Sequence, residues 1–356
     1  MTLTTEPIIN LGVFFEISFL LKLALVLIIL NNFKCLPFVW HIRLLRGFRF
    51  VLRSNRYKNA PGPAQLFQPL IISSGGSLME MDYNLHKSNS TYFADLDVAR
   101  CHLMCTLFNR GVDYARNTKS VGLLGSSNGM VGLALGAVSC TFRREVKPCQ
   151  RYEIWSRVLT WDQKWMYIVT HFVRKDAIKP RSFTLLPGQV RRQGKLKDLA
   201  KKEDAIFASS LSKCVWKKGR RTIPPELMLQ ASGLLPPRAD QEDFFAALRE
   251  EPLSKLKLSR QAEEVYDIPF KIAEKIEETY DALTAYLSPE SDDSEGGFSA
   301  GPKEMRKQAE DEWTWDRIER ERQRGMEIAK SLAELDRLDG EFSAEADALG
   351  LRRDLW

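Results

Sequence analysis

Residues 81–104 read MDYNLHKSNSTYFADLDVARCHLM, and the rest of the chain is best interpreted around this stretch. An extended segment ends at Asp82, a polar turn follows, and Tyr92 opens a run with apolar residues at spacings of three and four. That spacing is typical of an amphipathic helix, and further apolar residues widen its stripe until little polar surface is left. We therefore predict a strand, a polar turn and a buried helix around which a sheet can wrap.

The segments on either side of this helix have the composition of β-strands. Upstream, residues 70–81 are predicted as one strand, interrupted at 73–77 by a turn or bulge around Gly75 and Gly76. Downstream, alternating, β-branched and aromatic residues predict strands over 131–143, 152–161, 165–173 and 206–216. Residues 177–204 are interrupted by Pro and Gly and predict an inserted basic loop. One strand, one buried helix and then antiparallel strands is the resulting order.

The turn between the first strand and the helix carries a resemblance to a known family. It fits the pattern D-x-x-G-H-x-N-N-x-x-Y through Asp82, His86, Asn89 and Tyr92. Leu85 stands at the Gly position and Ser88 at the first Asn position. In these residues the chain resembles the hot-dog thioesterases of the 4-hydroxybenzoyl-CoA thioesterase type. Over roughly residues 10–235 it is similar to their membrane-tethered branch, the thioesterase-superfamily-member and mesenchymal-stem-cell-antigen type with its fungal relatives.

This resemblance implies an α+β hot-dog fold, in which an antiparallel sheet wraps around a central helix. It implies an acyl-thioester hydrolase that acts on acyl-CoA or on a carrier-bound acyl or polyketide chain, in fungi often in secondary-metabolite biosynthesis. Coenzyme A or phosphopantetheine would enter as part of the substrate, with no other cofactor. The expected protein partner is an acyl carrier or polyketide synthase. A homodimer or higher homo-oligomer is also expected, with active sites at the interface between copies of the chain.

The resemblance also assigns roles to residues in the turn. Asp82 is the expected general base or nucleophile, and His86 and Asn89 would orient the turn or a water molecule. Because helix N-terminal N–H groups lack intrahelical partners, those near Ser90, Thr91 and Tyr92 are expected to form an oxyanion hole. Asp97 is a second acidic candidate, with pairing to Arg100 at i,i+3 as the structural alternative. Asp82 and His86 could also serve only to stabilise the turn.

Two other function classes stay open at this point. Leu85 and Ser88 depart from the family pattern, so a catalytically silent hot-dog that binds acyl chains or scaffolds partners at a membrane is the alternative. A hot-dog dehydratase is the third class, but the His-Phe-Pro-Gly-type loop of such enzymes is not found in the sequence.

The charge of the chain is divided between its two parts. Residues 1–235 hold 34 Lys and Arg against 15 Asp and Glu, whereas residues 236–356 hold 18 against 31. A basic domain suggests anionic lipid headgroups or a phosphorylated ligand, and no motif for nucleic acid accompanies the charge. Basic residues at 191–202 and the cluster Lys217, Lys218, Arg220 and Arg221 could bind the phosphates of coenzyme A. A solvated or lipid-facing surface is the alternative.

The N-terminal segment predicts a membrane anchor. Residues 11–30 contain only Glu16 and Lys22 as charged residues, and no Lys or Arg precedes them. This pattern favours a single membrane-spanning signal-anchor helix over a cleaved signal peptide. The basic residues that follow then place the catalytic domain in the cytosol, on an endomembrane such as the endoplasmic reticulum, by the positive-inside rule.

The six cysteines show no disulfide spacing, which agrees with a reducing compartment. Cys101, His102 and Cys105 share a helix face, but no second ligand pair accompanies them, so no metal site is predicted. The predicted organisation is an anchor at 1–35, a basic linker at 36–65, a hot-dog domain at 66–235 and an acidic extension at 236–356. We expect that extension to be mostly solvated, with helices at 243–251, 261–287 and 303–338; docking of the last helix is the alternative.

Overall fold

The computed structural model describes residues 11–48, 60–117, 131–178, 180, 183–185, 202–236 and 313–334. Its centre is a six-stranded sheet in the order β1-β3-β4-β5-β2, with β6 paired to β5. All five pairings are antiparallel. The strands are β1 (Leu70–Gly75), β2 (Val131–Phe142), β3 (Arg151–Trp161), β4 (Met166–Arg174), β5 (Ile206–Lys218) and β6 (Arg221–Ile223).

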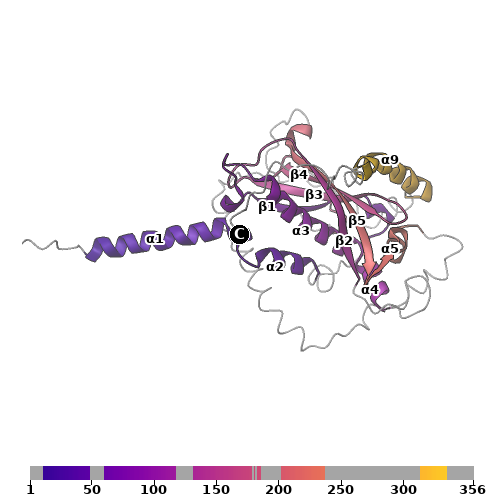
Figure 1. The fold of residues 1–356 in the computed structure, drawn as a ribbon, viewed down its shortest axis with the longest axis horizontal. Coiled ribbons are helices and arrows are strands. Elements are labelled where there is room, and N and C mark those ends of the chain that lie inside the picture. The colour runs from indigo at the N-terminus through magenta and orange to yellow at the C-terminus, as the bar shows by residue number, and fades with distance from the viewer. Residues whose placement is uncertain are drawn as a thin grey trace, which may run out of the picture.

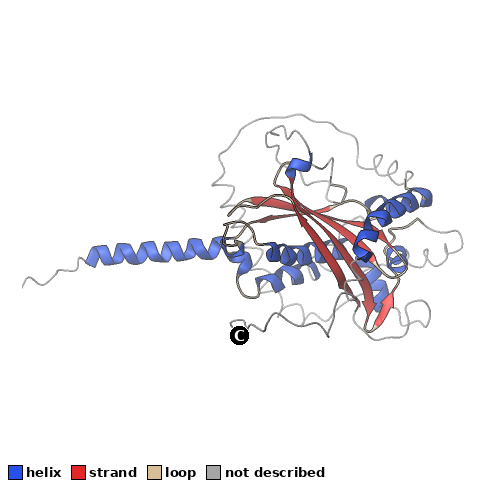
Figure 2. Cartoon of the chain, turned by 45° about the horizontal axis from the view of Figure 1, so that its top comes forward, coloured by secondary structure: helices blue, strands red, loops and turns tan. Residues whose placement is uncertain are grey.

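Helix α3 (Asn89–Leu107) lies along one face of this sheet (Figures 1 and 2). Near its N-terminal end the Tyr92 ring contacts Phe172 of β4, with ring centroids 4.8 Å apart. Just beyond its C-terminal end, Phe108 contacts Trp216 of β5 at 5.1 Å. Burial of Leu96 and Leu103 between these contacts stabilises the arrangement by about 1.5–3 kcal/mol per side chain. The predicted antiparallel sheet around a central helix is thereby confirmed.

Two predicted boundaries are wrong in detail. The strand predicted to reach residue 81 ends at Gly75, and a short 3-10 helix (Leu78–Glu80) follows it. The helix predicted to open at Tyr92 begins three residues earlier, at Asn89. The polar residues make this extra turn themselves, because the Ser88 carbonyl accepts bonds from both the N–H of Thr91, at 3.0 Å, and its hydroxyl, at 2.7 Å.

The N-terminal part contains α1 (Leu11–Asn31), a 3-10 turn (Phe33–Cys35) and α2 (Val39–Arg46). Helix α2 packs against α3: the Cys101 thiol donates to the Leu44 carbonyl at 3.5 Å, and a His102 ring nitrogen lies 3.2 Å from the Arg43 carbonyl oxygen. Part of the predicted linker is therefore a helix that covers α3. Within the described ranges, no helix has the length and apolar character needed to cross a membrane. The predicted spanning helix is therefore not confirmed.

Two short helices close the other end of the domain, α4 (Asn109–Asn117) and α5 (Pro225–Ala231). They approach so closely that a side chain at Gly111 would overlap the Ser232 hydroxyl and the Met228 carbonyl. The packing of α4 against α5 covers the core around the C-terminal end of α3.

Helix α9 (Trp315–Ala333) lies on the face of the sheet opposite α3 (Figure 1). It buries Ile318, Ala329 and Leu332, and its Arg322 carbonyl accepts a bond from the Thr160 hydroxyl at 2.6 Å. The last helix is therefore docked on the domain in the structure, which was the alternative to the predicted solvated helix. The helices predicted at 243–251 and 261–287 lie outside the described residues.

Candidate active site

Asp82 is anchored inside the turn that joins the 3-10 helix to α3. Its Oδ1 accepts the N–H groups of Asn84, at 2.9 Å, and of His86, at 3.2 Å. A backbone bridge between Met81 and Lys87 closes the turn. No donor in the described part of the chain contacts Oδ2 of Asp82. One carboxylate oxygen is therefore held in place, and the other is available for chemistry.

Leu85 has the backbone conformation for which the family pattern uses glycine. Its φ is 59°, in the left-handed region that L-residues with a Cβ rarely adopt. The side chain is mostly exposed, so burial does not compensate for this conformation. The turn thus has, at a leucine, a backbone conformation that glycine adopts with less strain.

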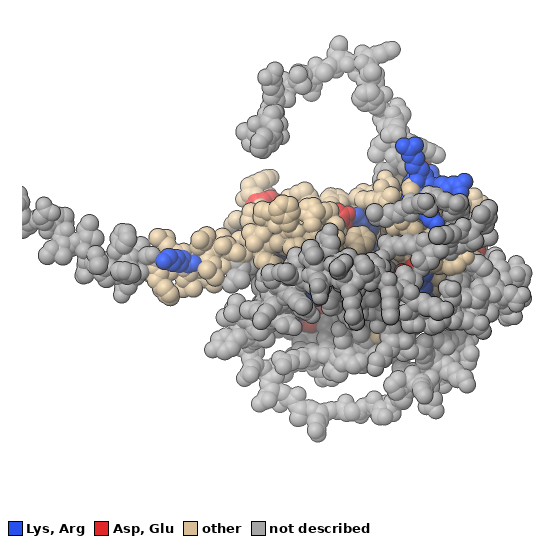
Figure 3. Space-filling model, turned by 90° about the horizontal axis from the view of Figure 1, so that it is seen from below, with Lys and Arg blue, Asp and Glu red and all other residues tan. Residues whose placement is uncertain are grey.

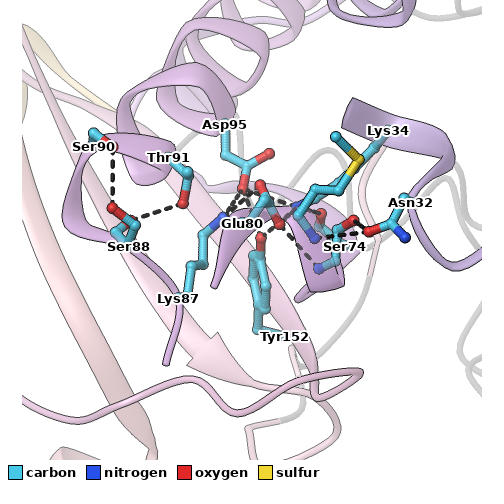
Figure 4. Close-up of polar contacts among 12 residues, drawn as sticks. Asn32, Lys34, Ser74, Glu80, Lys87, Ser88, Ser90, Thr91, Asp95 and Tyr152 are labelled. Atoms are coloured by element: carbon cyan, nitrogen blue, oxygen red, sulfur yellow. Dashed lines mark hydrogen bonds and ion pairs between the residues drawn. The ribbon is translucent and has the colours of Figure 1, made fainter. Parts of the chain in front are cut away.

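A buried ion cluster lies at the two ends of the turn, and Figure 4 shows Lys34, Glu80, Lys87 and Asp95 of this cluster pointing toward one another. It consists of Lys34, Arg43, Glu80, Lys87 and Asp95, with the hydroxyl of Tyr152. Lys87 lies 2.7 Å from Glu80 and 3.1 Å from Asp95, and Lys34 lies 2.6 Å from Glu80. Because Glu80 and Lys87 flank the turn on both sides, their ion pair fixes its two ends.

The cations keep the carboxylate at its centre charged. Burial alone would raise the pKa of Asp95, but Lys34, Lys87, Arg43 and the Tyr152 hydroxyl hold it well below its usual range. The hydroxyl of Tyr152 donates to Asp95 at 2.6 Å, and burial together with this carboxylate raises the pKa of that phenol. Burial, partly offset by Asp95, lowers the pKa of Lys34. The cluster is a network in which every charge has a partner.

This cluster was not predicted from the sequence. Asp95 sits within the apolar stripe of α3 between Tyr92 and Leu96, and an acid at such a position is the signal that could have revealed a buried partner. Its partners could not be identified, because Tyr152 lies 57 residues away in the chain and Lys34 lies 61 residues away.

The structure brings several predicted site residues together at the N-terminal end of α3. A His86 ring nitrogen lies 3.0 Å from the Glu145 carboxylate in an exposed pair. Asn89 and Ser90 are exposed in the first turn of the helix, whereas the N–H of Thr91 is already bonded to Ser88. These positions, from His86 to Thr91, lie within nine residues of Asp82 in the chain.

Other predicted residues have structural roles. Tyr92 lies in the core between Phe142 and Phe172, so its side chain does not line an open site. Asp97 pairs with Arg100 one turn further along α3, and this was the structural alternative for it. Burial, only partly offset by Arg100, raises the pKa of Asp97.

The predicted phosphate-binding cluster lies elsewhere. Lys217 and Lys218 end β5, Arg220 lies in the turn that follows, and Arg221 begins β6. This hairpin is at the Trp216 end of the sheet, beside the C-terminal end of α3, and Lys218 is buried. The 19-residue helix is about 28 Å long, so the cluster is not adjacent to Asp82 of the same chain.

Comparisons with known proteins place the chain in a family. The family model described as "Thioesterase-like superfamily" matches residues 77–227, which include the Asp82 turn, α3 and most of the sheet. The chain is 40% identical over 240 residues to "Probable thioesterase atnL" of Emericella nidulans, which covers 63% of this chain and 74% of the relative. The chain belongs to the thioesterase-like superfamily.

Further thioesterase-like relatives agree with this assignment. "Thioesterase poxG" of Penicillium oxalicum is 37% identical over 219 residues, covering 59% of this chain and 70% of the relative. "Thioesterase lcsJ" of Purpureocillium lilacinum is 31% identical over 351 residues, covering 90% of this chain and 93% of the relative. The similarity to the latter thus extends beyond the residues that the family model matches.

Proposed function

We propose that this thioesterase hydrolyses acyl-CoA or carrier-bound acyl or polyketide thioesters, with Asp82 as nucleophile or general base. The observation that carries the proposal is the anchoring of Oδ1 by the N–H groups of Asn84 and His86, with Oδ2 available. As a nucleophile, Oδ2 attacks the thioester carbonyl, the thiol departs, and water then hydrolyses the acyl-aspartate. As a base, Oδ2 takes a proton from the attacking water. Either route yields a carboxylic acid and a thiol.

Donors for the oxyanion come from the start of α3. The N–H groups of Asn89 and Ser90 belong to the first turn, where intrahelical acceptors are lacking and the helix dipole is positive. They replace the Ser90-to-Tyr92 set of the sequence analysis, because the helix begins earlier. His86, held by Glu145, is proposed to orient the turn and not to transfer a proton.

The proposal extends to assembly and location. We place the protein, on its sequence motif, in the 4-hydroxybenzoyl-CoA thioesterase type, with no cofactor beyond the thiol part of the substrate. Strand β2 pairs only with β5 among the described strands, so its other edge is suited to antiparallel pairing with a second copy. We further propose attachment to a membrane with the domain on the cytosolic side, on the basis of the apolar N-terminal segment and the basic residues after it.

The test is thiol release by the full chain from a panel of acyl-CoA and acyl-pantetheine substrates, for wild type and Asp82→Asn. The Asn side chain keeps an Oδ1 that can accept both turn N–H bonds, so the substitution removes the charge and preserves the turn. We expect a loss of at least about a hundredfold in kcat, as for other groups acting directly on the reacting atoms.

Asp97→Asn serves as the matched control, because it removes an acid from α3 without touching the turn. A wild-type protein that binds acyl-CoA and releases no thiol would favour the silent binding module, for which the strained Leu85 would be the structural reason.

A further inference from the structure

Large apolar side chains are exposed around the candidate site. Those that lie on the 3-10 helix and on the Asp82 turn form what we call the apolar rim: Leu78, Met79, Tyr83 and Leu85, with exposed fractions of 44%, 65%, 93% and 67%. Apolar groups of this size are normally covered by something in the working molecule when they gather in one place. None of the described residues covers them.

The rim is continuous with α1. The side-chain amide oxygen of Asn32, just past the end of α1, accepts the N–H of Met79 at 2.7 Å, and the Ser77 hydroxyl donates to the Asn31 carbonyl at 3.1 Å. Helix α1 projects from the domain at this point (Figure 1). Every side chain from residue 19 to residue 29 is exposed.

The exposed apolar side chains of α1 indicate what covers α1 and the apolar rim. Eleven consecutive exposed positions span three turns and therefore all sides of the helix, and all but Lys22 are apolar. A groove on a partner protein covers one face of a helix, whereas hydrocarbon surrounds it completely. A lipid bilayer is thus the one occupant that fits α1 and the rim together.

The charges beside the rim agree with a bilayer surface. Arg143 and Lys147 are exposed on the loop that follows β2, whereas Arg144 of this loop pairs with Asp204 and Glu145 lies beside His86. This loop adjoins the base of α1, because the Cys149 thiol lies 3.5 Å from the Asn31 amide oxygen and the Lys147 carbonyl lies against Gly76. Cations next to an exposed apolar surface are suited to anionic headgroups. On the face seen in Figure 3, the surface beside the base of α1 is mostly uncharged.

We propose that the apolar rim inserts into the surface of a lipid bilayer beside α1, so that the Asp82 turn faces the lipid. Acyl chains dissolved in the bilayer then reach the candidate site without crossing water. Contact of the rim with lipid rests on the proposed membrane attachment but not on the proposed thioester hydrolysis, whereas the route for the acyl chain rests on both.

Photocrosslinking of the full chain tests lipid contact without relying on activity. The photoreactive residue p-benzoylphenylalanine replaces Tyr83 in one protein and Ile328 in another, and each is irradiated with vesicles of phosphatidylcholine and phosphatidylserine. Ile328 is the matched control, since it is an exposed apolar side chain on α9 at the other side of the domain. We expect a phospholipid adduct at position 83 and none at 328. Absence of an adduct at 83, equal adducts at both positions, or crosslinking of position 83 to protein would overturn the proposal.

Kinetics test the route of the substrate. The variant Leu78→Gln/Met79→Gln/Tyr83→Gln keeps the charge of the turn unchanged and leaves Leu85 in place. We expect kcat/KM for a long-chain thioester presented in vesicles to fall about tenfold or more, because several large side chains lose their lipid contact. The rate for a short, water-soluble thioester should not change, and Ile328→Gln should change neither rate.

Equal losses for both substrates would refute the lipid route. A wild-type protein inactive on every thioester would refute the proposed function, and the crosslinking result would still decide lipid contact.

Discussion

Leu85 stands at the glycine position of the thioesterase motif that the Asp82 turn resembles, and its φ is 59°. A left-handed backbone costs a residue with a Cβ about 1–2 kcal/mol, while glycine loses about 0.5–1 kcal/mol of chain entropy instead. The exposed Leu85 side chain gains little from burial. We expect Leu85→Gly to raise the free energy of unfolding by up to about 1 kcal/mol in a denaturant titration.

Tyr83→Gly is the control for this prediction. It lies in the same turn and is exposed, but it is not among the residues with positive φ. It should lower the free energy of unfolding by several tenths of a kcal/mol. A loss of stability in Leu85→Gly as large as that of the control would contradict the strain argument.

Asp95 is the second residue whose environment makes a quantitative prediction. Its replacement by Asn leaves Lys34, Lys87 and Arg43 without their common carboxylate in a buried site, and we expect a loss of about 3–5 kcal/mol. Asp97→Asn, on the same helix but half exposed, should cost about 1 kcal/mol or less. Equal losses in the two variants, measured by chemical denaturation, would rule out the cluster as the stabilising feature.

The same carboxylate predicts a pH dependence. Because the pKa of Asp95 is lowered in the folded protein, its contribution is complete above the unfolded value of about 3.9 and is lost as the pH falls below it towards the folded value. Wild type should therefore lose stability steeply on acidification below about pH 4, and Asp95→Asn should show a shallower decline. Parallel pH profiles of the two proteins would contradict this assignment.

At the scale of elements, α9 depends on a glycine. A Cβ at Gly325 would lie 2.4 Å from the Leu159 carbonyl oxygen, which is within van der Waals overlap of the β3 backbone. Ala normally stabilises a helix over Gly by about 0.8–1.0 kcal/mol, yet here the clash should reverse the sign, and Gly325→Ala should destabilise by about 1–3 kcal/mol. Ser331→Ala, at an exposed position of the same helix, should be close to neutral.

Limited proteolysis locates this effect. If α9 leaves the sheet in Gly325→Ala, cleavage within residues 313–334 accelerates while the central domain persists. Unchanged cleavage together with higher stability would show that α9 does not need the close approach.

At the scale of the whole molecule, the proposed pairing of a second copy along the open edge of β2 makes a prediction. Leu135 and Phe142 are large, apolar and exposed on this strand. A Lys at an interface position places a charge where water is excluded, so Leu135→Lys should shift a dimer to monomers in light scattering after size exclusion. Ile328→Lys on α9 is the control and should leave the mass unchanged. A wild-type protein that is monomeric at micromolar concentration would refute pairing through β2.

The sequence by itself determined the central helix, the antiparallel strands and the motif around Asp82. These features are local: the helix follows from apolar spacing, the strands from β-branched and alternating residues, and the turn from a short polar motif. The start of the helix lies a few residues before the predicted one, because the hydrogen bond from the Thr91 hydroxyl to the Ser88 carbonyl adds polar residues that the apolar pattern does not include. Features formed by residues that are close together in the sequence could therefore be predicted.

Only the tertiary structure decided what the long-range contacts do. It joined Lys34 and Tyr152, which are 118 residues apart, around Asp95, and it placed α9 on β3 through the close approach of Gly325. It also separated the basic hairpin from Asp82 by the length of α3. In each case the partner is distant in the chain, and no periodic or compositional signal specifies which side chains meet. The physical reason is that burial and charge pairing depend on the folded neighbours, whereas helix and strand patterns depend on the chain itself.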